Sequence, residues 1–414
     1  MYFSQENPDI DGTVEQFPAR CCKVTGDVEI MRRLFNIFNI ENNMNKHDKI
    51  VVDARMINMS GIGRYIQAMI PALIENFQKV TLMGSMVEIS KFEWADKGIV
   101  IEVNAPIYSL SEQAEIIWKT PKCDIFISPH YNVPILLPQA KKVAVIIPDT
   151  NHLVFAKELS FVKRMYAKIF YQFAVNKDII FTISDFSKSE IVKFTKCKPQ
   201  KIIIAKCAID KDHFRKLDKE LSTNKTSPEV ENYKNDNYVL FTGNVKPHKN
   251  LTRALLAFEE VAKNQTDLKF LIVGKRDNFI TGDNKIFKLV EESPFLIERV
   301  KFTGRISDLN LAFLYKHAKA FLFPSLYEGF GLPPLEAMIF GCPVIASREG
   351  SLPEVCGDAA YYCDAYDVED ISRAIVQVLS NEALKKDLII KGFSKVEEYD
   401  WAIFNNSILN GLSQ

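Results

Sequence analysis

The chain has 414 residues, a length that exceeds one ordinary hydrophobic core. Single cores stop growing at roughly 250–300 residues, so two domains are expected. Apolar residues make up 47% and charged residues 25%, which excludes a wholly disordered or collagen-like chain and is typical of a globular one. Lys plus Arg and Asp plus Glu number 52 each, so the net charge gives no argument for a nucleic acid partner.

The cysteines and the N-terminus indicate the expected compartment. Eight cysteines are too dilute for a disulfide scaffold, and no C-x-x-C pair suggests a zinc or thioredoxin-like site, so reduced thiols are expected. The first residues, MYFSQENPDIDG, lack the basic start and apolar run of a signal peptide. No stretch approaches the roughly 18 consecutive apolar residues of a membrane span. We therefore expect a cytoplasmic protein.

The first part of the chain is expected to form an appendage and then a sheet. Residues 1–47 have a mixed composition and end in an Asn-rich segment. We expect them to form an N-terminal appendage with one helix. Residues 48–214 contain short apolar runs of the kind found in buried parallel strands, with helical or loop segments between them. These runs occupy 49–57, 79–83, 99–103, 124–128, 142–147 and 179–183. Their alternation with helices predicts a Rossmann-like α/β domain.

A second series of the same kind follows residues 215–236, a polar stretch expected to be a linker. The second Rossmann-like domain is expected over 237–383, and the helices of 384–414 are expected to cross back to the first domain. The apolar runs of the second domain occupy 238–243, 268–274, 299–304, 318–325 and 342–347. Ligands of such sheets bind at the carboxyl ends of the strands, here in a cleft between the two domains.

The most informative segment is PSLYEGFGLPPLEAMIFGCPVIAS at 324–347. Its glycines and prolines keep the chain open after a strand, and the following helix N-terminus favours an anion. Glu328 lies on the loop and Glu336 lies one to two turns into the helix, so both carboxylates can face one bound molecule. Carboxylates bind neutral sugar hydroxyls and repel phosphate, so we expect sugar at the glutamates and phosphate at the amides. For a lone glutamate pair, the alternative is a turn with two solvated side chains.

This segment resembles the Glu-x7-Glu signature of retaining GT-B glycosyltransferases, the glycosyltransferase group 1 or mannosyltransferase-like family of bacterial surface polysaccharide pathways. The resemblance covers roughly residues 49–410, and SLPEVCGDAA at 351–360 matches the family's usual continuation. It implies that Glu328 contacts the donor sugar and acts in catalysis, and that Glu336 contacts the ribose. It also implies donor contacts from the loop residues Gly329, Phe330, Gly331 and Leu332.

The second motif, FTGNVKPHKNL at 241–251, places a lysine at another helix start. A strand ends at Gly243, and Asn250 is expected to cap the helix that follows. Lys249 would lie beside the diphosphate and stabilise the negative charge that develops on the leaving oxygen. The alternative is an ordinary surface lysine.

The family usually carries Arg and Lys together in this motif, whereas this chain has Asn244 and His248 at those places. Both stay candidate donor-binding residues, and Lys246 or His248 could supply the missing charge. His248 would do so only in part, because a free imidazole with a pKa of about 6.5 is mostly neutral at pH 7.

The third motif, SGIGRYIQAMI at 60–70, is a glycine turn between a strand and a helix. By itself such a turn is weak evidence, and a dinucleotide site is disfavoured because Ile66 stands where G-x-G-x-x-G needs its third glycine. In the family this loop approaches the donor phosphate and the acceptor. The resemblance therefore makes Gly61 and Gly63 donor-binding candidates and Arg64 an acceptor-binding candidate.

Two further predicted strands, in IFISPHYNVP and VAVIIPDTNHLVF, end in polar residues at the expected cleft. Asp149 and His130 are candidate catalytic residues, and Asp149 and His152 are candidate acceptor-binding residues. Relatives commonly have His-Asp at the end of the second strand, whereas Pro148 takes the His place here. A loop cap at Asp149 and solvated or packed histidines are the alternatives.

Arg305 follows another strand of the second domain, and the resemblance makes it a donor-binding candidate at the nucleotide base. A surface arginine is the alternative. The stretch KELSFVKRMYAKIFYQFAVNK at 157–177 carries five basic residues and one acid, with apolar residues at helical spacing. Such a helix can lie on an anionic membrane, which would suit a lipid-linked acceptor. The alternative is an ordinary helix with a solvated face.

Together these features predict a retaining, metal-independent hexosyltransferase that uses no cofactor. Its donor would be a nucleotide diphosphate sugar, with GDP-mannose favoured over UDP-glucose and UDP-N-acetylglucosamine, and its acceptor a glycan or a lipid-linked glycan. The expected setting is surface polysaccharide or glycolipid assembly in the cytoplasm, with peripheral contact at the inner membrane face. A catalytically inert relative that binds nucleotide sugars, or a GT-B epimerase or phosphorylase, is the rival hypothesis.

Overall fold

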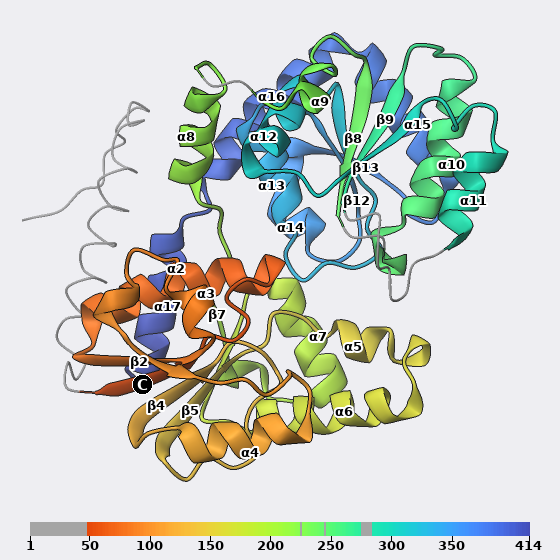
Figure 1. The fold of residues 1–414 in the computed structure, drawn as a ribbon. Coiled ribbons are helices and arrows are strands. Elements are labelled where there is room, and N and C mark those ends of the chain that lie inside the picture. Colours follow the sequence, from red (N-terminus) through yellow and green to blue (C-terminus); the bar gives the residue numbers. More distant parts are fainter. Residues whose placement is uncertain (1–47, 224–225, 244–245, 275–283) are drawn as a thin grey trace, which may run out of the picture. The chain divides into compact units, whose positions relative to one another are not determined.

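The computed structural model describes residues 48–414, except 224–225, 244–245 and 275–283 (Figure 1). The N-terminal appendage predicted over 1–47 therefore lies outside the described residues. In the part of the chain that is described, no helix combines the length and the apolar character needed to cross a membrane. The described residues form two parallel sheets with helices between their strands.

The first sheet has seven strands in the order β3-β2-β1-β4-β5-β6-β7. Its strands are β1 (Lys49–Asp53), β2 (Lys79–Gly84), β3 (Ile99–Glu102), β4 (Cys123–Ser128), β5 (Ala140–Ile146), β6 (Ile179–Thr182) and β7 (Ile202–Ile204). All its pairings are parallel, with Val51 of β1 opposite Phe126 of β4. The central strand β1 is buried along four of its five residues, which explains its continuous apolar run.

The second sheet has six strands in the order β10-β9-β8-β11-β12-β13. Its strands are β8 (Tyr238–Thr242), β9 (Lys269–Val273), β10 (Val300–Gly304), β11 (Ala320–Phe323), β12 (Val344–Ser347) and β13 (Ala360–Cys363). These strands also pair in parallel, with Ala320 of β11 opposite Val239 of β8. The prediction of two Rossmann-like α/β halves is therefore confirmed.

Two strands, β7 and β13, were absent from the sequence prediction. Each pairs on one side only, at the edge of its sheet, and each has three or four residues. Runs this short give a weak pattern, although β3, β6, β11 and β12, also of four residues, were predicted. They are identified by their pairing with β6 and β12.

The helices lie between the strands in chain order. The first half contains α2 (Ser60–Asn76), α3 (Met86–Ile89), α4 (Leu110–Lys119), α5 (Asn151–Val154), α6 (Phe161–Val175) and α7 (Asp185–Thr195). The second half contains α10 (Leu251–Ala262), α11 (Asn284–Glu292), α12 (Asp308–His317), α13 (Leu332–Ile339), α14 (Leu352–Cys356) and α15 (Val368–Ser380). The chain ends with α16 (Glu382–Glu397) and α17 (Trp401–Leu412).

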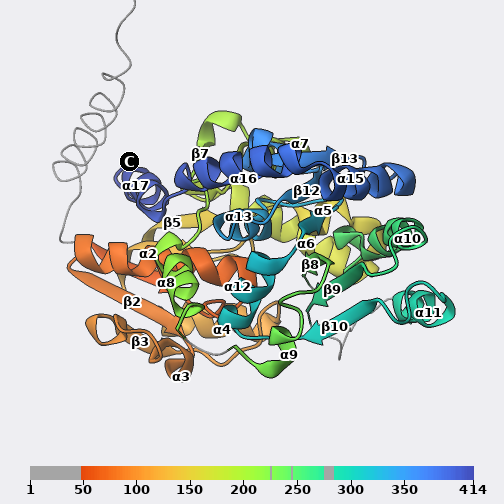
Figure 2. The same cartoon turned by 90° about the horizontal axis from the view of Figure 1, so that it is seen from above.

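The stretch 215–236, predicted as a polar linker, is partly helical. Helix α8 (Lys211–Glu220) continues into it, and α9 (Pro228–Glu231) follows. Helix α8 buries Phe214 and Leu217, and it lies beside α12 (Figures 1 and 2), where Lys316 Nζ is 2.6 Å from Asp218 Oδ1. The two apolar residues of α8 stand among many charged ones, so they gave too weak a sequence signal, although they are enough to pack this ten-residue helix.

The order of the strands determines where a site can form. Both sheets reverse their winding direction beside the first strand of the half, between β1 and β4 and between β8 and β11. Loops that leave the carboxyl ends of these strands diverge, and ligands of doubly wound sheets bind there. The motifs that begin at Gly243 and Pro324 follow β8 and β11, so they meet at one such point.

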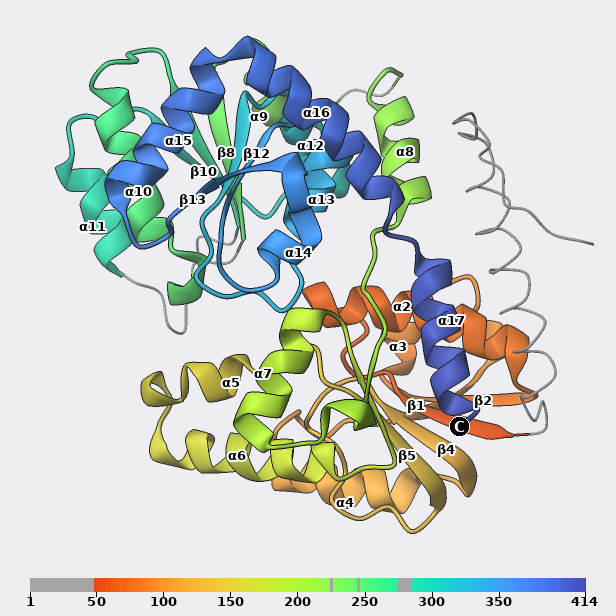
Figure 3. The same cartoon turned by 180° about the vertical axis from the view of Figure 1, so that it is seen from behind.

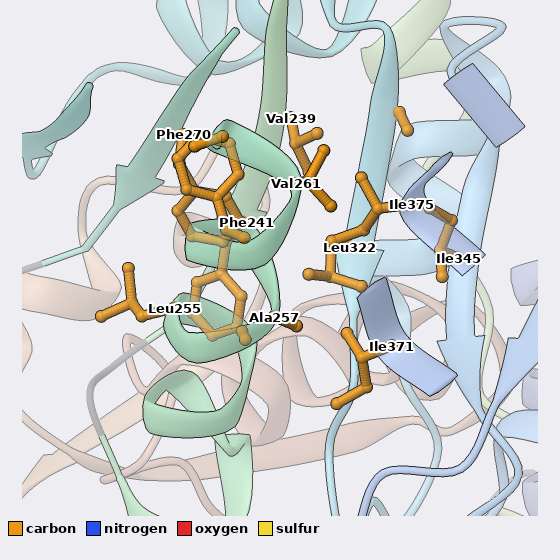
Figure 4. Close-up of a cluster of buried hydrophobic side chains, with 14 of the residues drawn as sticks. Val239, Phe241, Leu255, Ala257, Val261, Phe270, Leu322, Ile345, Ile371 and Ile375 are labelled. Carbon is orange, nitrogen blue, oxygen red and sulfur yellow. The ribbon is translucent and has the colours of Figure 1, made fainter. Parts of the chain in front are cut away.

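The core of the second half is a continuous set of aliphatic and aromatic side chains. Figure 4 shows side chains from β8, β9, β11 and β12 gathered with those of α10 and α15. The labelled members are Val239, Phe241, Leu255, Ala257, Val261, Phe270, Leu322, Ile345, Ile371 and Ile375, all nearly inaccessible to solvent. This packing holds β8 and β11 rigidly side by side, so the loops that follow them keep fixed positions.

The last helix, α17, packs against the first sheet, whereas α16 packs on helices of the second half (Figure 3). Asn405 Nδ2 donates to Ala68 O of α2 at 3.1 Å. Gly411 lies so close to β6 that a Cβ atom added there would be 2.4 Å from Cε1 of Phe181. The absence of a side chain at this position lets the helix dock.

Buried polar groups occupy the carboxyl edge of the first sheet. Arg55 donates to both carboxylate oxygens of Asp53, at 2.8 and 2.7 Å, and to Glu112 Oε2 at 2.7 Å. Glu112 Oε1 accepts from Asn132 Nδ2, and Tyr166 OH donates to Asn132 Oδ1. Every charge in this network has a partner, as buried charges require. The network holds the loop after β4, which carries His130.

His130 is buried in that loop, where its Nδ1 accepts from the Asn132 N–H at 3.4 Å. Burial, with the charge of His152 adding to the effect, lowers the pKa of His130 to about 3. The imidazole is therefore neutral in the folded protein at pH 7.

We predict that replacing Gly411 by alanine lowers the free energy of unfolding by about 1–3 kcal/mol, because the new methyl group overpacks the contact with Phe181. Thermal unfolding of Gly411→Ala measures this change. Gly98→Ala is the matched control, since the nearest atom to its Cβ would lie at an ordinary 3.5 Å. Equal melting temperatures for the two variants would contradict the proposed tight docking of α17.

We predict that His130 makes stability fall on acidification. The unfolded chain binds a proton at this histidine near pH 6.5, whereas the folded protein binds it only near pH 3. Unfolding is therefore favoured increasingly as the pH falls from 6.5 toward 3, by up to about 1.4 kcal/mol per pH unit. Urea unfolding at pH 7 and pH 5 should show a smaller loss for His130→Gln than for the unchanged protein. Equal losses would show that His130 is not held neutral.

Candidate functional site

The centre of the site is an ion pair between the two motifs of the second half. Lys249 Nζ lies 2.6 Å from Glu328 Oε1, although the residues are 79 positions apart in sequence. Both side chains are largely buried, and the ammonium group also lies 4.9 Å from the centre of the Phe323 ring. The stem of Lys249 lies next to Gly243, which has a φ of +144° that favours glycine. A cation and a carboxylate are thus held together where the loops after β8 and β11 meet.

The backbone of Glu328 is hydrogen-bonded to Ser351 and closely approached by Gly350. Ser351 donates to Glu328 O from its N–H at 3.1 Å and from its hydroxyl at 3.0 Å. Gly350 has a φ of +66°, and a Cβ atom there would lie 2.7 Å from Glu328 N. These supporting residues were not singled out individually from the sequence, although SLPEVCGDAA was noted as a continuation of the motif.

The loop that carries Glu328 also contacts the first half. Tyr327 OH accepts from the Thr150 N–H at 3.0 Å. Gly329 O accepts from the hydroxyls of Ser184, at 2.6 Å, and Ser187, at 3.0 Å. A Cβ atom on Gly329 would lie 2.8 Å from Asp149 Cβ, so glycine is needed for this approach. The two halves therefore meet at Tyr327 and Gly329, the two neighbours of Glu328 in the chain.

A second contact between the halves lies beside the first. The carboxylate of Glu354, in α14, accepts from the Asp185 and Phe186 N–H groups at the start of α7, both at 3.2 Å. Lys206 Nζ lies 3.1 Å from both Glu354 and Asp185. A carboxylate at a helix N-terminus is stabilised by the unpaired N–H groups there. Contacts between residues this far apart left no pattern in the sequence.

Three helix starts in this region lack a capping side chain: those of α2, α10 and α13. The other helices of eight or more residues whose starts are described all have a side-chain oxygen that accepts from the first turn. Helices α10 and α13 follow glycine-containing loops. The prediction of a glycine turn at the third motif is wrong, because α2 begins at Ser60 and Gly61 and Gly63 already lie in its first residues.

Unpaired N–H groups at a helix start favour a bound anion. The first turns of α2 and α10 can offer such groups, whereas Pro333 and Pro334 of α13 have no N–H, which leaves Leu332 as the donor among the first three residues of that helix.

The prediction that Asn250 caps α10 is wrong. Its backbone is left-handed, with a φ of +61°, and its side chain makes no cap hydrogen bond. Asn250 Nδ2 instead donates to Pro324 O at 3.0 Å and to Ala365 O at 2.6 Å. The side chain thus ties the loop after β11 to the start of α10, and the helix N-terminus keeps its free N–H groups.

The two glycines of the third motif differ in whether a side chain would fit at their position. A Cβ atom on Gly63 would lie 2.3 Å from Ile57 O, so this position needs glycine for packing inside the half. A Cβ atom on Gly61 would meet nothing within 4 Å. Gly61 therefore leaves open space at the uncapped start of α2, as a donor-binding position would.

Glu336 lies beside a different set of charges. Tyr315 OH is 3.4 Å from Glu336 Oε2, and burial raises the pKa of Glu336 while the positive charge of Arg64 opposes that rise. Arg64 NH2 lies 3.7 Å from Asp308 Oδ2, which His213 also approaches, at 3.3 Å. Arg64, predicted to bind the acceptor, is thus placed beside Glu336 and the second half.

The remaining donor-binding candidates of the second half are His248, Asn244, Arg305, Leu332 and Phe330. Burial, with the charge of Lys249 adding to the effect, lowers the pKa of His248 to about 4, so His248 is neutral at pH 7. Asn244 lies outside the described residues. Arg305 is exposed, and its side chain forms no ion pair within the described ranges. Leu332 is the first residue of α13, and Phe330 is buried with its carbonyl accepting from Ser351.

The acceptor-side candidates gather at the carboxyl edge of the first sheet. Burial raises the pKa of Asp149 and lowers the pKa of His152, and the charge of Glu328 raises the pKa of Asp149 further. Asp149 Oδ1 accepts from the Asn151 N–H at 2.9 Å. The Nδ1 atom of His152 is buried and has no partner among the described residues. Asp149 therefore does cap the turn after β5.

Tyr108, which was not predicted from the sequence, also lies at this edge. Its ring centre lies 5.8 Å from that of His130 and 6.3 Å from that of His152, and the side chain is partly exposed. Its backbone is left-handed, with a φ of +68°, and its N–H donates to Glu112 Oε1 at 3.0 Å. A tyrosine in this conformation is uncommon and is held here by the buried carboxylate. No local pattern in the sequence marks it.

The arrangement brings together most of the predicted residues. Lys249, Glu328 and the uncapped helix starts offer a cation, a carboxylate and free N–H groups at one place. Asp149 and the aromatic edge of the first sheet lie next to them across Gly329. Such a set can hold a diphosphate by its oxygens and a sugar by its hydroxyls, which are the two parts of an activated sugar.

Comparison with known proteins agrees with this geometry. Residues 222–395 match the family model described as "Glycosyl transferases group 1". The O-antigen chain mannosyltransferase B of Escherichia coli is 32% identical over 236 residues, which are 56% of this chain and 59% of that protein. The serotype-specific mannosyltransferase WbdA of Escherichia coli is 28% identical over 253 residues, 59% of this chain and 31% of that protein. The similarity thus spans less than two thirds of the length of either relative.

The fold resembles a solved structure over most of the chain. The structure of Anabaena Alr3699/HepE in complex with UDP-glucose superposes with a TM-score of 0.70, covering 89% of this chain and all of that one. The identity is 15%, so this likeness concerns the fold. The described residues have the two-domain GT-B fold, and the second half carries the match to the glycosyl transferases group 1 model.

Proposed function

We propose that this protein is a retaining glycosyltransferase that moves a hexosyl group from a nucleotide diphosphate sugar to an acceptor hydroxyl. The observation that carries the proposal is the Lys249–Glu328 pair, set among three uncapped helix starts. In the proposed complex the diphosphate lies on the free N–H groups and Lys249, and the sugar hydroxyls lie on Glu328. The ribose hydroxyls lie on Glu336.

The proposed reaction proceeds on one face of the sugar. The bond between the anomeric carbon and the phosphate oxygen breaks, and the acceptor oxygen bonds to the same carbon from the same side. The acceptor proton passes to the leaving phosphate oxygen. Lys249 stabilises the charge that develops on that phosphate, so the mechanism needs neither a metal nor another cofactor. Asp149 and His130 line the acceptor side, and His152 and Tyr108 extend it.

We further propose mannose, from GDP-mannose, as the transferred sugar and surface polysaccharide or glycolipid assembly as the setting. The support is that the curated relatives with 28–32% identity are named mannosyltransferases of O-antigen chains or serotypes. The acceptor would be a glycan or lipid-linked glycan, and the protein would work in the cytoplasm. Thermal unfolding with GDP-mannose, UDP-glucose and UDP-N-acetylglucosamine tests the choice, because a donor that binds the folded state raises the melting temperature. Stabilisation by a UDP-sugar alone would overturn GDP-mannose.

We predict that Lys249→Ala and Glu328→Ala each lower donor turnover by about 100-fold or more, because each removes a contact to the transition state. Transfer and donor hydrolysis rates measure the loss. Lys316→Ala is the matched control. It also breaks an ion pair of 2.6 Å, between Lys316 and Asp218, but this pair is exposed on the surface. Near-normal turnover in either site variant would refute the assignment. Donor binding without turnover in the unchanged protein would favour the inert relative.

We predict that Glu336→Ala mainly raises the KM for the donor, by about 10–100-fold, with little change in kcat. A hydrogen bond from the ribose to a carboxylate contributes about 1.5–3 kcal/mol to binding. Steady-state kinetics separate the two constants. Tyr315→Phe is the control, because it removes the 3.4 Å hydroxyl contact and leaves the carboxylate in place. An unchanged KM in Glu336→Ala would remove the ribose role.

A further inference from the structure

Helix α6 has apolar side chains on two opposite faces. One face is buried in the core of the first half and includes Ala167, Phe170 and Ala174. A second set recurs at spacings of three and four residues along the same helix. This set, named here the α6 stripe, consists of Val162, Met165, Ile169 and Phe173.

The α6 stripe faces away from the core. At about 100° per residue, its members fall on the side of the helix opposite the buried set. Their side chains are exposed, with Met165, Ile169 and Phe173 at 38–45% and Val162 at 75%. A surface helix normally carries polar residues on this side. The stripe therefore needs an explanation other than packing within the half.

The charges around the α6 stripe are basic. Helix α6 itself carries Lys163, Arg164 and Lys168 and has no acidic residue. The acidic residues nearest to it in the chain are Glu158, before its start, and Asp178, after its end. Because the basic residues flank the stripe on both sides of the helix, an apolar surface is bordered by positive charge.

Exposed apolar residues continue beyond α6 onto the neighbouring segments. Lys177 Nζ, just after the helix, donates to Pro134 O at 2.8 Å and to Ile135 O at 3.2 Å, and next to these lies the exposed Leu136. The Ile135 N–H in turn donates to Gln113 of α4 at 3.0 Å. Helices α4 and α6 lie on the same side of the first sheet (Figures 1 and 3), and α4 exposes Trp118 at 82%.

We propose that this face, formed by the α6 stripe with Leu136 and Trp118, binds an anionic lipid surface. The residues beside the stripe include the basic Lys168 and the neutral Gln172 and Asn176, and α6 carries no acidic residue. An apolar stripe with basic and neutral neighbours matches the boundary between acyl chains and negatively charged headgroups. Aromatic residues such as Trp118 favour the same boundary. The inner face of α6 supports the acceptor side of the site, because Tyr171 OH donates to Asp149 O at 3.0 Å. The helix would thus hold the membrane and the site at a fixed distance.

Flotation of the full chain with lipid vesicles tests this proposal. We expect binding to vesicles of equal parts phosphatidylglycerol and phosphatidylcholine, and much weaker binding to phosphatidylcholine alone. The triple variant Met165→Gln, Ile169→Gln, Phe173→Gln should lower the apparent affinity for the anionic vesicles by about tenfold or more, through loss of buried apolar area. The matched control is Val87→Gln, Ile297→Gln, Ile390→Gln, which changes three side chains of 52–70% exposure on other surfaces. The control should bind as the unchanged chain does.

A second pair of substitutions tests the electrostatic part. Lys163→Gln with Lys168→Gln should weaken binding to anionic vesicles by about fivefold per residue and leave binding to phosphatidylcholine unchanged. Unchanged melting temperatures confirm that the variants fold. Equal vesicle binding by the stripe variant and its control would overturn the proposal. So would a change in oligomeric state with the stripe variant in the absence of lipid, since the stripe would then cover a second copy of the chain.

Discussion

The Lys249–Glu328 ion pair is the contact on which the arrangement of the site depends. It exists because β8 and β11 are adjacent in the sheet although their sequences are far apart, so the loops that leave them meet at the reversal of strand order. A largely buried lysine and glutamate require each other, since either charge alone would be costly to bury. The pair therefore fixes both loops relative to each other. A ligand that displaced one partner would have to supply a matching charge or hydrogen bond.

The loop that carries Glu328 is held by both halves of the chain. Ser351 binds its backbone from the second half, and Thr150 and Ser184 bind its neighbours from the first. Glycine at position 329 makes this approach sterically feasible. The donor side and the acceptor side are thus joined through one short segment. Any movement of one half relative to the other would therefore change the position of Glu328.

In the first half, buried charged residues also hold loops in fixed positions. Arg55 and Glu112 form a fully paired network beneath the loop after β4, and Glu112 also holds Tyr108 in its unusual backbone conformation. Rigid aromatic and imidazole groups are thereby presented next to Asp149. Under the proposed function this edge receives the acceptor, and the proposed lipid-binding face of α6 lies on the other side of the same helix that supports Asp149.

The sequence alone was sufficient to predict two α/β halves and the residues of their glycine-containing motifs. These features are local: apolar runs, glycines and helix starts follow one another along the chain, so their pattern carries the information. Most strands were therefore predicted, including the four-residue strands β3, β6, β11 and β12, whereas the edge strands β7 and β13 were not. Glu328 and Lys249 were singled out with the help of the resemblance to a known family, whereas their ion pair was not predicted.

Tertiary structure alone decided how these motifs are supported. The side chain of Asn250, expected to cap its own helix, instead binds carbonyls 74 and 115 residues away. The support of Glu328 by Gly350, the contact of Tyr327 with Thr150 and the strained position of Tyr108 likewise join distant segments. Helix α8 forms in a stretch expected to be a linker because α12 and α13 cover its two apolar residues. Such contacts depend on the path of the whole chain, and no local pattern of residues encodes them.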